Sequence, residues 1–151
     1  MDLTRERCRS VVVTAPPVFD SSPIQAGLGG CPWRVAVASI LLCRTRRCQM
    51  QGVLATLFAK WPTPGDLARA DESTLEALVR PCGLHRTRAR QLIRFSNRWL
   101  GDAWTDMRDL PGVGTYVADA VSIFCFGART MDGADGVLET YLEGLHCLET
   151  T

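Results

Sequence analysis

The segment from Leu110 to Phe126 constrains the fold of this chain more than any other part. It reads Leu-Pro-Gly-Val-Gly-Thr-Tyr and continues into a run of mostly apolar residues with helical character. Two glycines one residue apart allow a tight turn and a close approach of the backbone to a ligand. The first N–H groups of the following helix favour an anion at that point. We therefore expect a hairpin that opens a helix and binds phosphate through Gly112, Gly114 and Thr115.

Composition and charge narrow the class of protein. The 151 residues make up one domain's worth of chain, and 46% hydrophobic with 22% charged residues is ordinary globular composition. No apolar run approaches the roughly 18 residues that a membrane span needs, so we expect no membrane association. Residues 33 to 108 contain 13 Arg or Lys but six Asp or Glu, and further acidic residues collect near the C-terminus. A basic body fits a protein that follows a phosphate backbone, although ordinary solvated helix faces would give the same charge pattern.

The periodicity of apolar residues predicts an all-α protein. Residues 1–22 show no sustained period, so we expect a loosely packed or flexible arm followed by a domain over residues 23–151. We expect no strand, a short turn at 66–70, and helices near residues 32–42, 50–60, 71–79, 87–100, 115–126 and 136–148. The seven cysteines include no CxxC pair, which indicates reduced intracellular thiols and no zinc or other metal site.

Several separated patches together carry a resemblance to a known family. They are Ser22–Gln25, Cys31–Trp33, Leu42–Thr45, Pro81–His85, Arg88–Ala89, Phe95–Ser96, Gly112–Tyr116, Ile123–Cys125 and Asp135–Leu138. Their order and spacing resemble the helix-hairpin-helix, Gly/Pro-rich loop and aspartate (HhH-GPD) superfamily of DNA glycosylases. The pattern is most similar to its thymine and uracil mismatch enzymes, the branch of methyl-CpG-binding domain protein 4. The resemblance implies a two-lobed helical fold with the DNA cleft between the lobes.

The resemblance also implies which residues contact the DNA. A glycosylase must turn a nucleotide out of the duplex, and side chains must fill the space that it leaves. Arg44 lies where the family has its plug residue, and Leu84, followed by His85, lies where it has its wedge. Gln25 is similar to the family's base-reading glutamine, whose amide suits the imide edge of uracil and thymine. Without the family, Arg44 reads as half of a surface ion pair and Leu84 as a helix-cap contact.

Tyr116 lies at the position where strand-cutting relatives have a catalytic lysine. An amine forms a Schiff base with the sugar, whereas a phenol does not. The resemblance therefore implies a monofunctional enzyme in which Tyr116 contacts the flipped pyrimidine. The alternative is a buried aromatic residue whose hydroxyl is satisfied within the protein.

Two aspartates compete for the role of catalytic acid. Asp132 resembles the aspartate of adenine-removing relatives. Asp135 precedes Leu138 by three positions and Tyr141 by six, which matches the mismatch enzymes. We choose Asp135, whose carboxylate would stabilise an oxocarbenium-like sugar and orient the attacking water. Taken alone, an aspartate at the start of a helix is more often an N-cap.

The expected cofactors and partners follow from the same resemblance. Many relatives hold an iron–sulfur cluster with four closely spaced cysteines after the catalytic helix, but here only Cys147 follows it, so no cluster is expected. A monovalent cation bound by hairpin carbonyls is compatible with the sequence.

We expect a monomer that removes thymine or uracil from G:T and G:U mismatches in double-stranded DNA and passes abasic sites to downstream repair enzymes. It would work inside the cell, in the nucleus of a eukaryote or in the cytoplasm and nucleoid of a prokaryote. Three alternatives stay open: a non-catalytic DNA-binding module, a glycosylase for another base such as mispaired adenine, and a helical protein-interaction domain.

Overall fold

The computed structural model describes residues 2–10, 15–19, 22–43 and 47–150. Within these ranges the chain is helical without a strand, and its one bridge pairs Thr4 with Asp106. The all-α expectation is therefore confirmed. The helices are α1 (Arg5–Arg9), η1 (Ile24–Gly27), α2 (Pro32–Leu42), α3 (Arg47–Lys60), α4 (Pro64–Ala68), α5 (Glu72–Val79), η2 (Arg80–Cys82), α6 (His85–Leu100), η3 (Met107–Asp109), α7 (Thr115–Phe126) and α8 (Gly136–Thr150).

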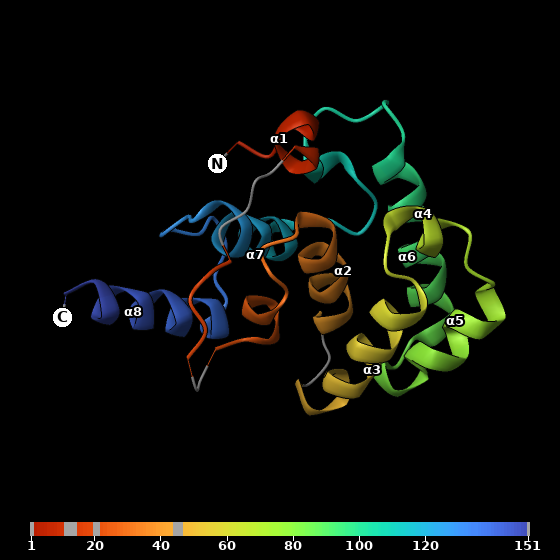
Figure 1. Cartoon of the computed structure of the whole chain (residues 1–151), viewed down its shortest axis with the longest axis horizontal. Helices are drawn as coiled ribbons and strands as arrows, with labels where there is room; N and C mark the ends of the chain where they lie inside the picture. Colours follow the sequence, from red (N-terminus) through yellow and green to blue (C-terminus); the bar gives the residue numbers. More distant parts are fainter. Residues whose placement is uncertain (1, 11–14, 20–21, 44–46, 151) are drawn as a thin grey trace.

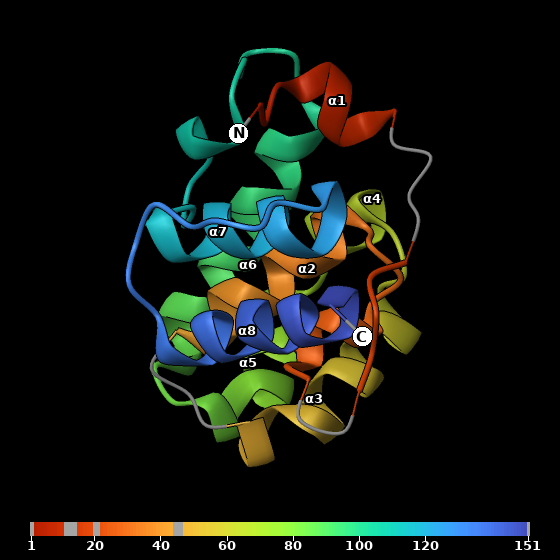
Figure 2. The ribbon, with the colours of Figure 1, turned by 90° about the vertical axis from the view of Figure 1, so that its left-hand side faces the viewer.

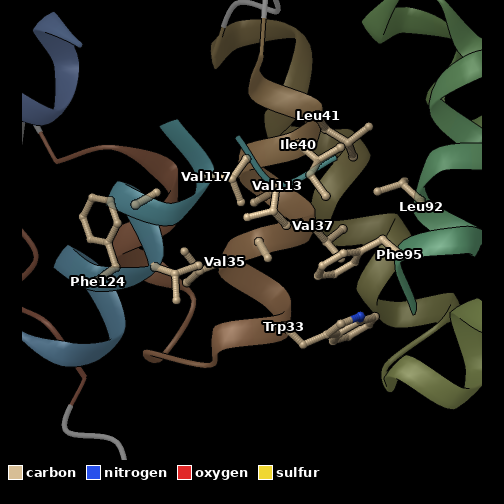
Figure 3. Packing of buried hydrophobic residues seen from close by; sticks show 14 of the residues in the cluster. Trp33, Val35, Val37, Ile40, Leu41, Leu92, Phe95, Val113, Val117 and Phe124 are labelled. Carbon is tan, nitrogen blue, oxygen red and sulfur yellow. The ribbon is translucent and has the colours of Figure 1, made fainter. Parts of the chain in front are cut away.

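Helix α2 forms the centre of the molecule. It begins with Pro32, whose fixed φ suits the first turn of a helix, and its residues are buried on almost every side. Helices α3 to α6 lie on one side of it and α7 and α8 on the other, with α7 packed directly against it (Figure 1). In the core, Trp33 points toward Phe95 of α6, and Val35 points toward Phe124 of α7 (Figure 3). α2 thus joins the two lobes.

The lobe around α6 is built from amphipathic helices. α6 packs its apolar side against α4 and α5 and leaves a row of arginines outside. The sequence predicts a turn at residues 66–70, but the structure has helix α4 there. Thr63 starts this helix because its side chain accepts a hydrogen bond from the N–H of Asp66, and Pro64 occupies the first turn. The expected turn is therefore wrong.

Residues 2–10 do not form the loosely packed arm that the sequence predicts. Leu3 and Cys8 are buried in the core, and the N–H of Met107 donates to the carbonyl of Leu3 at 2.9 Å. The side chain of Arg5 donates to the carbonyl of Trp104 at 2.8 Å. α1 consequently lies against the segment that follows α6 (Figures 1 and 2). Short segments of this kind lack the length that periodicity needs to report burial.

Helix α8 crosses the α7 side of the molecule (Figure 2). Its buried residues are Leu138, Tyr141 and Leu145. The Tyr141 ring packs against Phe124 of α7 and stacks on Phe19, with ring centroids 4.8 and 5.3 Å apart. Among the described residues, no helix has both the length and the apolar character needed to cross a membrane.

Candidate active site

The glycine hairpin precedes α7 as the sequence predicts. Leu110 and Val113 are buried and fix the turn to the core, and the N–H of Val113 donates to the carbonyl of Leu110 at 3.2 Å. Gly112 has a φ of +82°, a conformation that favours glycine. Gly114 and Thr115 are exposed, and no side chain caps the start of α7. The free N–H groups of that first helical turn therefore face outward, as phosphate binding requires.

Tyr116, in the first turn of α7, lies beside Gln25. Gln25 lies in η1, is 1% exposed, and donates from Nε2 to the Tyr116 hydroxyl oxygen at 2.9 Å. The same amide nitrogen donates to Ser39 Oγ of α2 at 3.4 Å, and Ser39 in turn donates to the carbonyl of Val35. Three segments far apart in sequence thus meet in one polar cluster within an otherwise apolar interior. This cluster brings together two of the residues predicted to contact the base.

Burial controls the ionisation of Tyr116. It raises the pKa of the phenol from its ordinary value of 10.0 to about 12, opposed by the hydrogen bond from Gln25. The negative charge of Asp135 and the nearby Cys43 raise the pKa further. At neutral pH the hydroxyl is therefore protonated. Because it accepts from Gln25, its own proton remains available to another acceptor.

Asp135 lies at the start of α8 and has two relations to its surroundings. Its Oδ1 accepts a hydrogen bond from the N–H of Leu138 at 3.0 Å, which is the N-cap arrangement. Its charge also acts on Tyr116, as the pKa of that phenol indicates. No described residue donates to Oδ2, which leaves that oxygen for a water or a sugar. The Asp132 side chain, by contrast, is exposed.

The proposed wedge residue occupies a strained turn. Leu84 has a φ of 47°, in the left-handed region, where no other described residue apart from glycine lies. Its side chain is 66% exposed. An apolar side chain held outward on a strained backbone is costly, and such costs concentrate at functional positions.

A cavity of about 170 Å³ connects this turn with the hairpin. Leu84 and Thr87 line it on the α6 side, Cys43 at the end of α2, and Gly112 at the hairpin. The structure therefore brings the proposed wedge residue, the end of α2 and the hairpin turn at Gly112 around one hollow. Arg44, predicted to be the plug, lies outside the described residues.

The proposed DNA contact of His85 has a different partner in the structure. Its Nε2 lies 3.3 Å from Glu76 Oε1 of α5, and Arg86 reaches the same carboxylate oxygen at 3.4 Å. His85 is thus engaged with α5, next to the exposed Leu84.

Two buried charges support the site and were not predicted from the sequence. Arg88, 6% exposed, donates to the carbonyls of Gly83, Ile40, Leu41 and Cys43. Asp119, in α7, accepts from the N–H groups of two residues before Asp135. The signal was present for Asp119, because a single aspartate interrupts an apolar helix. Arg88 lies in one of the patches that carry the family resemblance, but its contacts with backbone carbonyls gave no such signal, since it is one of several arginines in α6.

The cysteines and acidic residues do not assemble a metal site within the described part of the chain. No group of three or more His, Cys, Asp or Glu side chains is placed there to hold a metal ion. Cys8, Cys31, Cys43 and Cys125 are free thiols. Whether the protein works without a cofactor stays a prediction.

Comparison with known proteins agrees with this fold. Residues 37–143 match the family model described as HhH-GPD superfamily base excision DNA repair protein. Because the match covers more than half of the chain, the protein belongs to this superfamily. The family resemblance deduced from the sequence is thereby confirmed.

Two individual proteins are also similar to this chain in sequence. The chain is 38% identical over 112 residues to the methyl-CpG-binding domain protein 4-like protein of Arabidopsis thaliana, covering 74% of this chain and 25% of that protein. It is 33% identical over 104 residues to the thymine-DNA glycosylase of Aeropyrum pernix, covering 64% of this chain and 47% of the relative. The chain thus spans between a quarter and half of the length of these relatives.

Solved structures share the fold. A thermostable thymine-DNA glycosylase superposes with a TM-score of 0.60 at 26% identity, covering 66% of this chain and 49% of the other. A non-covalent endonuclease III–DNA complex superposes with a TM-score of 0.61, also at 26% identity, covering 72% of this chain and 54% of the other.

Proposed function

We propose that this chain is a monofunctional DNA glycosylase of base excision repair that hydrolyses thymine or uracil from G:T and G:U mismatches. The observation that carries the proposal is the grouping of Gln25, Tyr116 and Asp135 behind the hairpin. Gln25 contacts the Tyr116 hydroxyl at 2.9 Å, and the Asp135 charge acts on the same phenol. A DNA-binding module needs the hairpin alone, whereas a base-removing enzyme needs such a pocket as well.

The wedge and hairpin would prepare the substrate. The N-terminal N–H groups of α7 hold a backbone phosphate, and Leu84 enters the duplex from its exposed turn. Unstacking a nucleotide costs a few kcal/mol, and a mismatched base costs least. Mismatches are therefore favoured before any contact with the base is made. Arg44 would fill the space that the flipped nucleotide leaves.

Asp135 would carry out the chemistry. As the bond between C1′ of the sugar and N1 of the pyrimidine breaks, its electron pair leaves with the base and positive charge develops on the sugar. The Asp135 carboxylate stabilises that charge and accepts a proton from the water that attacks C1′. The products are a free base and an abasic site, which downstream repair enzymes would process.

Gln25 and Tyr116 would select the base. The Nε2 of Gln25 is engaged by Tyr116 and Ser39, which leaves Oε1 to accept from the N3–H that uracil and thymine share. The protonated Tyr116 hydroxyl can donate to a pyrimidine carbonyl. The names of the relatives, which include a thymine-DNA and a thymine/uracil-DNA glycosylase, support this substrate class.

A gel assay with end-labelled duplexes tests the proposal. Each duplex carries one central G:T, G:U or A:G mismatch, with G:C and A:T duplexes as controls, and is incubated with protein and then treated with alkali. We expect alkali-dependent cleavage at T or U, and none in the matched duplexes. Asp135→Asn should lower the rate by at least about 100-fold, whereas Asp132→Asn, which alters an exposed side chain, should leave it within about threefold.

Other outcomes refute particular parts of the proposal. Tight binding without an abasic site in any duplex would identify a DNA-binding module. Cleavage at A in A:G alone would identify an adenine enzyme. Loss of activity in Asp132→Asn but not in Asp135→Asn would reverse the choice of acid, and strand cleavage without alkali would show lyase activity. Tyr116→Lys should introduce such cleavage, because a buried lysine loses its proton readily and becomes a nucleophile.

A further inference from the structure

A buried carboxylate lies one helical turn from the proposed base pocket. Asp119 is in the middle of α7, is 4% exposed and has apolar residues on both sides. Its Oδ1 accepts from the N–H of Asp132 and its Oδ2 from the N–H of Gly133, each at 2.9 Å. Each oxygen therefore binds one backbone donor of the same loop. Among the described residues no cation pairs with Asp119, so these two N–H groups are its compensation for burial.

The loop that Asp119 binds has little else to fix it near the site. Between Ala128 and Leu138 no side chain is fully buried, and Met131 is only partly so. Gly133 approaches α7 so closely that a Cβ there would lie 2.9 Å from Thr115 Cγ2 and 3.2 Å from Asp119 Oδ2. Apolar packing therefore does not set the position of this loop. Two hydrogen bonds and a close backbone contact fix it beside Asp119, and an ion pair between Arg129 and Glu149 at 2.8 Å holds its start.

The geometry connects this tether to the proposed catalytic acid. Tyr116 and Asp119 are three residues apart and so lie on the same face of α7. A loop bound to Asp119 is consequently brought next to Tyr116, and Asp135 follows only two residues after Gly133. We propose that Asp119 is a positioning residue that holds Asp135 against the base pocket through the backbone of Asp132 and Gly133. This inference rests on the proposed function for its catalytic part.

The first test measures the tether without any substrate. Amide hydrogen exchange of Asp132 and Gly133 is compared by NMR between the wild type and Asp119→Asn, in which an amide NH₂ replaces one acceptor. We expect faster exchange at both amides in the variant. Asp71→Asn is the matched control, because Asp71 also accepts a backbone N–H but caps α5 far from the loop. Unchanged exchange of the two amides in Asp119→Asn would overturn the proposal.

The second test asks whether Asp119 acts through Asp135. Single-turnover excision and affinity for a duplex are measured for Asp119→Asn, Asp135→Asn and the double variant. We expect Asp119→Asn to lower the rate about 100-fold, the effect of a misplacement of about 1 Å, with DNA affinity unchanged within about threefold. In the Asp135→Asn background the same substitution should change the residual rate less than about threefold. Multiplying effects in the double variant would overturn the proposal.

A second variant protects the test against a folding defect. Gly133→Ala leaves the carboxylate intact but puts a methyl group against Thr115 and Asp119, so the loop or these side chains must shift. We expect the same loss of rate with retained DNA affinity. Full activity of Gly133→Ala with a displaced loop would contradict the proposal. If the wild type excises no base from any duplex, the proposed function is wrong, whereas the exchange measurement still decides whether Asp119 holds the loop.

Discussion

Replacing Arg88 with methionine should destabilise the protein at the wedge turn. The guanidinium donates from Nε to the carbonyl of Gly83 at 3.1 Å, and from Nη1 to those of Ile40 and Leu41 at 2.9 and 3.0 Å. A further bond reaches the carbonyl of Cys43. The last carbonyls of a helix lack partners within it, so Arg88 completes the C-terminus of α2 while it holds the turn before Leu84.

The size of the effect follows from the two carbonyls that belong to fully buried residues. Those of Ile40 and Leu41 lose their donor in Arg88→Met, and an unsatisfied buried acceptor costs about 1–3 kcal/mol. The carbonyls of the exposed Gly83 and Cys43 can bind water instead. Removal of a buried charge recovers part of the loss. We therefore expect a decrease of about 3 kcal/mol in the free energy of unfolding, or about 6–12 °C in Tm for a chain of this length.

Urea unfolding followed by circular dichroism measures this change. Arg90→Met is the matched control, because Arg90 lies in the same helix but forms an exposed ion pair with Glu72 at 2.7 Å. Its loss should leave the free energy of unfolding nearly unchanged, because exposed ion pairs contribute little. Arg88→Lys should fall between the wild type and Arg88→Met, since an ammonium cannot reach all four carbonyls as the guanidinium fork does. Equal stability of Arg88→Met and Arg90→Met would refute the argument.

Three further predictions concern backbone strain and ionisation. Leu84→Asn should raise the free energy of unfolding by about 1 kcal/mol, because asparagine tolerates a φ of 47°, and it should lower the rate of base excision. Lower stability of this variant would show that the backbone at Leu84 is not strained. Gly112→Ala should lower the free energy of unfolding by about 1–2 kcal/mol, because of its φ of +82° and a close contact with Gln91. Gly52→Ala within α3 should raise it by about 0.5–1 kcal/mol in the same urea unfolding experiment. Burial raises the pKa of the Cys8 thiol from 9.0 to about 12, so above pH 9 the unfolded chain ionises first and stability falls by up to about 1.4 kcal/mol per pH unit. The free energy of unfolding of Cys8→Ala should fall less steeply than that of the wild type between pH 8 and pH 10.5. Equal slopes of stability against pH in the two proteins would exclude ionisation of Cys8 as the cause.

The parts of the fold that apolar periodicity reports were predictable. Six of the helices, the hairpin at Gly112 and the absence of strands from the described residues agree with the sequence. The start of α2 at Pro32 and the N-cap at Asp71 were also readable, because capping residues act locally. The family followed from the spacing of separated patches, and the match over residues 37–143 agrees with it. These features depend on residues that are close in sequence or on a pattern known from the family, so they can be predicted without the tertiary structure.

The packing of residues 2–10 and the helix at α4 could not be read in this way. Leu3 and Cys8 are isolated apolar residues among charges, and their burial depends on the segment near Met107, about a hundred positions away. α4 has five residues, which is too short for a period of 3.6 to be visible. In both cases the deciding contact is tertiary. Local sequence favoured exposure, and the fold reversed it.

The same limit explains why the contacts of Arg88 and Asp119 could not be predicted from the sequence. The side chains of the turn at Gly83 and Leu84 and of the loop before Asp135 are exposed or partly buried, so these segments do not bury enough apolar surface to fix themselves. Their backbone groups need hydrogen-bond partners, because a buried carbonyl needs a donor and a buried N–H group needs an acceptor. A guanidinium binds the carbonyls at the wedge, and a carboxylate binds the N–H groups at the loop. The two charged side chains belong to helices of the core, Arg88 to α6 and Asp119 to α7. The turn before Leu84 and the loop before Asp135 are therefore attached to the core through these side chains. A sequence shows the charge of each residue but not the backbone groups it will meet, and that pairing is what the fold supplies.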